Sequence, residues 1–215
     1  MRGLAITGLV SLVLMQTAVV WQDGSPLGFT SLGEAIYMSP LRWVIMLAPL
    51  GMVFFLSFRV QKMSVSAAQM TFWAFAALLG VSLSSIFAVY TATSITQVFF
   101  ISAATFGAMS LWGYTTKRDL TQMSSFLMMG LIGVIIAMVV NIFLASSALA
   151  FAISVIGVLI FVGLTAYDTQ KIKEMYSVSD DGTVAGRKAI MGALSLYLDF
   201  INIFLFLLQL FGDRR

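Results

Sequence analysis

Long apolar segments recur along this chain of 215 residues. A helix needs about 20 mostly apolar residues to cross a bilayer, because each residue advances it by about 1.5 Å. Only 10% of the residues are charged, whereas a soluble domain has about 25%, so the chain cannot cover a water-facing surface. The sequence therefore predicts one all-α domain over residues 1–215, a polytopic integral membrane protein. Seven segments are expected to span the bilayer, namely Leu4–Trp21, Leu41–Phe58, Ala67–Tyr90, Ile95–Tyr114, Phe126–Leu144, Leu149–Tyr167 and Ala189–Phe211.

Positive charge predicts the orientation of these segments. If every segment spans, most basic residues fall in the loops of one side, and such loops face the cytoplasm. The N-terminus is then cytoplasmic. Seven full spans would place Arg214 and Arg215 outside, whereas a re-entrant last segment would return them to the cytoplasm. Seven spans are favoured because Ala189–Phe211 is long enough to cross. The basic residues of the cytoplasmic side are Arg2, Arg59, Lys62, Lys117, Arg118, Lys171, Lys173, Arg187 and Lys188.

The first segment also has features of a signal peptide, since Met1 and Arg2 precede an apolar run. No small-x-small cleavage pattern follows it, so a retained helix is expected. Two longer loops are predicted at Gln22–Pro40 and Ser177–Gly186. The second contains Asp-Asp-Gly without the spacing of a calcium-binding loop, and a solvated turn is the favoured interpretation.

The residue types that are missing exclude several kinds of chemistry. The chain has no cysteine and no histidine, so thiolate metal sites and serine–histidine hydrolysis are unavailable to it. A net charge of +3 gives no support for nucleic-acid binding. No enzymatic activity and no cofactor are expected. If the protein senses pH without histidine, the expected sensor is a carboxylate.

One carboxylate, Asp199, interrupts the last apolar segment. A charged group at the bilayer centre costs roughly 2.5–3.5 kcal/mol, and such residues usually mark ion or proton handling. It belongs to a stripe of small and polar residues along one helix face. Ser195 and Asn202 in this stripe are best explained by hydrogen bonds between helices, whereas Asp199 favours a functional interpretation. The other members of the stripe are Gly192 and Gln209.

A second carboxylate, Asp168, ends the preceding apolar segment and is followed by Lys171 and Lys173. It fits a lysine-paired residue at the membrane rim as well as a functional one. If Asp168 and Asp199 meet, they would titrate as a unit, and the deprotonated pair would offer oxygen ligands to Ca²⁺. Spacing alone does not establish this contact, because Asp199 lies roughly 15 Å into an ideal helix.

The C-terminal sequence ALSLYLDFINIFLFLLQLFG (Ala193–Gly212) resembles the signature of the Bax inhibitor-1, or transmembrane BAX inhibitor motif, family. Three further stretches agree with it in the correct order. The resemblance implies seven helices, with a central C-terminal helix enclosed by the other six. The supporting stretches are Leu47–Phe54, Gly107–Gly133 and Ala166–Tyr176.

Bacterial members of that family are implicated in a pH-sensitive calcium leak, which implies a location in the bacterial inner membrane. Their paired aspartates, on the sixth and seventh helices, correspond here to Asp168 in YDTQKI and Asp199 in LYLDFIN. A gating arginine at the end of the second helix corresponds best to Arg59, which is equally explained as a positive flank of the membrane segment. Family members commonly have a longer polar stretch before the first helix than this chain has.

The leading hypothesis is thus a passive Ca²⁺ leak, gated by protons, in a lipid bilayer. The alternative is a regulatory protein that binds a membrane protease or another membrane partner. A proton-coupled transporter is a weaker alternative, because no inverted repeat is evident. Tyr167-Asp168 is similar to one half of an intramembrane aspartyl protease signature, but the other half needs glycine where this chain has Leu198.

Overall fold

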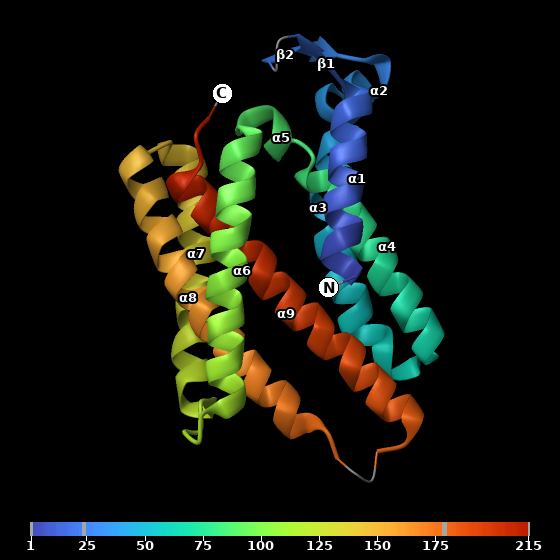
Figure 1. The fold of residues 1–215 in the computed structure, drawn as a ribbon, viewed down its shortest axis with the longest axis vertical. Helices are drawn as coiled ribbons and strands as arrows, with labels where there is room; N and C mark the ends of the chain where they lie inside the picture. Colours follow the sequence, from blue (N-terminus) through green and yellow to red (C-terminus); the bar gives the residue numbers. More distant parts are fainter. Residues whose placement is uncertain (1, 23–24, 178–179, 215) are drawn as a thin grey trace. The chain divides into compact units, whose positions relative to one another are not determined.

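The computed structural model describes residues 2–22, 25–177 and 180–214. The remaining residues, which include parts of both predicted loops and Arg215, lie outside the described part. Figure 1 shows the elements, which are α1 (Arg2–Ala18), β1 (Val19–Gln22), β2 (Ser25–Phe29), α2 (Ser31–Gly33), a π-helical turn (Glu34–Met38), α3 (Leu41–Arg59), a 3₁₀ turn (Val60–Lys62), α4 (Val65–Leu83), α5 (Ile86–Val89), α6 (Ala92–Thr115), α7 (Thr121–Leu144), α8 (Ser147–Met175) and α9 (Gly182–Phe211).

Within the described residues, six helices are long and apolar enough to span a membrane, and α1 is a shorter apolar helix of 17 residues. The prediction of an all-α, multi-pass membrane protein is therefore confirmed, while the seven-helix arrangement around a central helix stays a prediction. The predicted loop Ser177–Gly186 was too long, because α9 already begins at Gly182. The chain groups into two compact units, Met1–Ala92 with Gly182–Met191 and Arg214–Arg215, and Thr93–Asp181 with Gly192–Asp213.

In the first unit, α1 packs along α4 through hydroxyl groups. Thr7 Oγ1 donates a hydrogen bond to the carbonyl of Ala76 at 2.7 Å, and Ser11 Oγ donates to that of Gly80 at 2.6 Å. Gly80 has no room for a side chain, since an added Cβ would lie 2.7 Å from the carbonyl oxygen of Thr7. Small residues and hydroxyls of this kind let membrane helices approach closely.

The end of α1 differs from the sequence-based expectation. The predicted helix Leu4–Trp21 stops at Ala18, and β1 follows and pairs antiparallel with β2. Thr30 makes this possible, because its amide donates to the Ala18 carbonyl (3.0 Å) and its hydroxyl donates to the Thr17 carbonyl (2.9 Å). These bonds satisfy carbonyls that a helix end otherwise leaves without partners.

In the second unit, α7 and α8 run antiparallel and pack through glycines (Figure 1). A Cβ on Gly130 would meet Ile160, and one on Gly163 would meet Leu127. The contact between α6 and α8 is closer still, because a Cβ on Gly113 would overlap the backbone of Ala166. The helices of this unit are thus held at short distances set by glycine.

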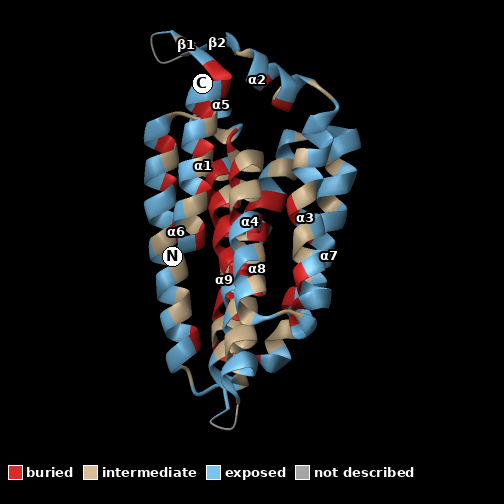
Figure 2. Cartoon of the chain, turned by 90° about the vertical axis from the view of Figure 1, so that its right-hand side faces the viewer, coloured by how far each residue is buried: buried red, intermediate tan, exposed pale blue. Residues whose placement is uncertain are grey.

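The last helix, α9, is the most buried of the spanning helices. In its most apolar stretch 56% of the residues are buried, compared with 39% for α8 and 11% for α7. Figure 2 shows buried residues concentrated along α9. A residue on α9 is therefore mostly surrounded by protein, whereas α7 exposes large apolar side chains such as Ile142 and Phe143.

Candidate ion and proton site

Asp199 lies inside the protein on an unbroken helix. Its side chain is only 4% exposed, and α9 continues without interruption from Gly182 to Phe211, so the expectation that this segment is long enough to cross holds. Among the described residues, its Oδ2 atom has no hydrogen-bond partner. A buried polar atom without a partner costs free energy, and its presence calls for a bound proton, water or ion.

The register of α8 against α9 places Asp168 and Asp199 on the stretches of the two helices that pack against each other. On one side of the pair, Ser154 Oγ donates to Gln209 Oε1 at 2.7 Å, and Gly157 leaves room for Phe206. On the other side, Gly192 lies against Ile172. The two carboxylates lie between these contacts and interact electrostatically. Asp168 is partly buried, and the two carboxyl groups, both in the described part of the chain, make no hydrogen bond with each other.

The other polar residues of the α9 stripe have different surroundings. Asn202 Nδ2 donates to the Leu198 carbonyl of its own helix at 2.8 Å, and the expected bond to another helix is absent within the described part of the chain. Ser195 is partly buried one turn before Asp199. The bond between helices is instead made by Gln209. Within the stripe, Asp199 is therefore the residue that has a buried side-chain atom without a hydrogen-bond partner among the described residues.

Gln170 connects α8 to the loop between α6 and α7. It is 6% exposed, its Oε1 accepts from the amide of Leu120, and its Nε2 donates to the carbonyl of Arg118, both at 2.8 Å. One turn later, Lys173 Nζ donates to the carbonyl of Tyr114, near the C-terminus of α6. These bonds hold the end of α8 that carries Asp168.

Gln170→Ala is expected to destabilise the protein by about 1–3 kcal/mol, the cost of leaving buried backbone groups without partners. The measurement is thermal unfolding of the purified protein in detergent. Gln122→Ala is the matched control, because Gln122 is exposed on α7 and should leave the unfolding temperature unchanged. Equal unfolding temperatures for the two variants would contradict a role for the Gln170 bonds.

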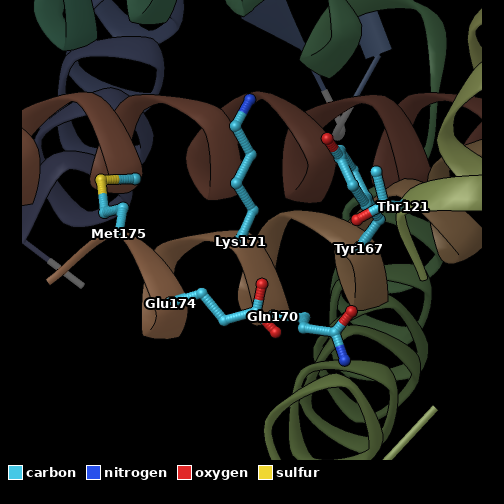
Figure 3. A pocket seen from close by; sticks show the side chains of 6 residues that line it. All are labelled: Thr121, Tyr167, Gln170, Lys171, Glu174 and Met175. Atoms are coloured by element: carbon cyan, nitrogen blue, oxygen red, sulfur yellow. The ribbon is translucent and has the colours of Figure 1, made fainter. Parts of the chain in front are cut away.

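A pocket of about 250 Å³ lies at the same end of α8. Figure 3 shows Tyr167, Lys171 and Met175 on one side of the helix and Gln170 and Glu174 on the other. Lys171 Nζ lies 5.7 Å from the centre of the Tyr167 ring. The pocket has room for several water molecules and reaches the residue next to Asp168. Its lining residues are Thr121, Tyr167, Gln170, Lys171, Glu174 and Met175.

Asp119, in the α6–α7 loop, holds the start of α7. Hydrogen bonds from the side chain and the backbone amide of Thr121 lower the pKa of Asp119 below its ordinary value of 3.8; the amide bond is 2.8 Å long. A lowered pKa in the folded state stabilises the fold above the ordinary value, and this stabilisation is lost as the pH falls through the lowered pKa. We expect hydrogen exchange at the Thr121 amide to lose protection below about pH 3.8, while Asp119→Asn should show no such step.

Arg59 is the last residue of α3, in the first unit, and its side chain is exposed. Its gating role stays a prediction. Within the part of the chain that the structure describes, no three acidic, histidine or cysteine side chains gather as they would around a metal ion. A cation at Asp168 and Asp199 would therefore need neutral oxygen atoms in addition.

Sequence reasoning missed two residues near the aspartates. The sequence does not single out Gln170, although it is a buried amide whose partners lie about 50 residues earlier. Ser110 was one serine among many, but its buried hydroxyl has no hydrogen-bond partner in the described part of the chain. Neither feature has a local sequence signal, because each depends on what another helix places beside it.

These features define a polytopic helical membrane protein with a buried aspartate on its last helix. The family model described as "Inhibitor of apoptosis-promoting Bax1" matches residues 1–215, and the chain belongs to this Bax inhibitor-1 family. It is 52% identical to the inner membrane protein YbhL of Escherichia coli K12, over 80% of this chain and 74% of the relative. It is also 52% identical to RP147 of Rickettsia prowazekii, over 80% of this chain and 73% of that relative. A protein of Borreliella burgdorferi is 45% identical to it, over 98% of this chain and 90% of that relative.

Proposed function

We propose that this protein is a pH-sensitive, passive Ca²⁺ leak whose gate is the pair Asp168 and Asp199. The observation that supports this most directly is the Asp199 carboxyl group, which is buried. One of its oxygens has no partner among the described residues, and the group interacts electrostatically with Asp168. A stable fold alone does not need such a group, because an apolar residue of similar size would avoid its desolvation cost.

Protonation would control the path as follows. With one proton bound, the pair carries one negative charge instead of two and attracts a divalent cation less strongly. After deprotonation, the carboxylates present hard oxygen ligands, which Ca²⁺ prefers. Two carboxylates provide at most four of the 6–8 oxygen atoms that Ca²⁺ takes, so water or neutral groups would complete the shell. An incomplete site of this kind favours transient passage over storage.

The pocket at the end of α8 supports this proposal, since it offers room for water one residue from Asp168. We place the protein in a bacterial inner membrane, because the relative YbhL is named an inner membrane protein. The N-terminus is proposed to be cytoplasmic on the basis of the positive charges. Ca²⁺ and protons are the proposed ligands, no covalent chemistry is required, and no cofactor is proposed.

The test is Ca²⁺ flux into liposomes that contain the purified protein, measured across a pH series. We expect flux above that of empty liposomes, increasing as the pH rises and the pair loses its proton. Flux equal to that of empty liposomes at every pH would reject the leak. The alternative, a regulator that binds a membrane protease or another membrane partner, predicts co-purification of the partner with wild type and aspartate variants alike.

A further inference from the structure

Ser110 lies on α6, in the second unit, and its hydroxyl is buried. On the same helix, Ser94, Val98 and Ser102 are buried. Ser110 follows Phe106 by about one turn. Its Oγ atom is buried and, among the described residues, has no hydrogen-bond partner.

Contacts of α6 with α9 and with α8 lie on either side of Ser110 along the helix. One turn before it, the ring of Phe106 meets that of Phe200 with centroids 5.6 Å apart, and Phe200 is the neighbour of Asp199. Three residues after it, Gly113 lies against Ala166, two residues before Asp168. Ser110 therefore lies between the points where α6 contacts the surroundings of each carboxylate.

The buried serines Ser94 and Ser102 of α6 both have hydrogen-bond partners. Ser102 Oγ donates to the Val98 carbonyl at 2.7 Å, and Ser94 Oγ accepts from the Asp213 amide at 2.9 Å. A serine in a helix can usually bond to the carbonyl four residues earlier, as Ser102 does, yet Ser110 does not. Its hydroxyl is left unpaired in the unit that also contains the unpaired Oδ2 of Asp199.

We propose that the Ser110 hydroxyl is a third polar group of the aspartate site, bound to the Asp199 carboxyl group through a water molecule and available as a neutral oxygen ligand. A water with these partners would satisfy both unpaired atoms, and buried waters typically bridge such groups. Asp168 on α8 and Asp199 on α9 are the acidic groups concerned, while Lys173 on α8 is held by Tyr114 and Lys171 lies over Tyr167.

The hydrogen-bond part of the inference can be tested without any flux. Infrared spectra of the protonated protein should contain a carboxyl band that disappears in Asp199→Asn. Ser110→Ala should shift this band, because Asp199 loses its bridged partner. Ser102→Ala is the matched control and should leave the band in place. Ser110→Ala should remain folded, because the loss of one neutral hydrogen bond costs only about 0.5–1.5 kcal/mol.

The ligand part rests on the proposed function. In liposomes at alkaline pH, Ser110→Ala should reduce Ca²⁺ flux by about two- to tenfold, which corresponds to the loss of one neutral hydrogen bond or ligand, while Ser102→Ala keeps the wild-type flux. An unshifted band in Ser110→Ala would overturn the inference whatever the flux. A shifted band in a protein whose wild type carries no Ca²⁺ would overturn the leak and leave the Ser110–Asp199 contact supported.

Discussion

Replacing Asp199 by asparagine is expected to keep Ca²⁺ flux low at every pH. Asparagine matches the protonated aspartate in shape and charge but cannot release a proton, so the site would stay in the form assigned to the closed state. An interaction with a charged group contributes about 1.5–3 kcal/mol, and each 1.4 kcal/mol changes an equilibrium about tenfold. The flux of Asp199→Asn in liposomes at alkaline pH should therefore be about tenfold or more below that of the wild type.

The matched control for this substitution is Asp213→Asn, just after α9. The backbone amide of Asp213 donates a hydrogen bond to Ser94 Oγ at 2.9 Å. The carboxylate of Asp213 accepts only a longer bond from the same hydroxyl, at 3.4 Å. This variant should keep the wild-type pH profile, while Asp168→Asn should also lower the alkaline flux. If Asp199→Asn and Asp168→Asn both carried Ca²⁺ with the wild-type pH profile, the aspartates would not be the gate.

Gly113→Ala is expected to be the most destabilising small substitution in the second unit. The new methyl group would overlap the backbone of Ala166, and a backbone cannot rotate away as a side chain can. Overpacking of this kind costs about 1–3 kcal/mol. It would also push α8 away from α6 close to Asp168. The loss of stability is measured by thermal unfolding, which the fluorescence of the neighbouring Trp112 reports.

The same helix provides a matched control for this clash. Gly107 has open space around an added Cβ, so Gly107→Ala should keep stability or raise it by about 0.5–1 kcal/mol through better helix propensity. The comparison separates the steric effect from the effect of alanine in a helix. A Gly113→Ala protein as stable as Gly107→Ala would show that α6 and α8 do not pack as closely as described.

Apolar length predicted the spanning helices well, because the cost of exposing polar groups to lipid leaves few other folds. The interior position of Asp199 was also predictable, since a stripe of small and polar residues on an apolar helix turns toward protein. Its closeness to Asp168 was not predictable from spacing. The distance between the two aspartates depends on the register of α8 against α9. The ring of Phe206, which packs against Gly157, helps to set this register.

The predicted helix Leu4–Trp21 included residues 19–21, which belong to β1, because their apolar side chains suit either structure. An Asp-Gly pair, Asp23 and Gly24, follows it in the sequence, and such a pair between apolar stretches is typical of hairpins. This signal could have predicted β1 and β2. The unpaired hydroxyl of Ser110 could not have been predicted, because satisfaction of a hydrogen bond is a property of the packed helices.

The length of α1 makes the first unit sensitive to the thickness of the bilayer. Its 17 residues extend about 26 Å, less than the roughly 30 Å of a typical hydrocarbon core. Because Thr30 satisfies the carbonyls at its end, the helix can stop there without leaving them exposed to lipid. Each Å of hydrophobic mismatch costs a fraction of a kcal/mol. Lipid chain length should therefore affect the stability of the first unit, which contains neither Asp168 nor Asp199.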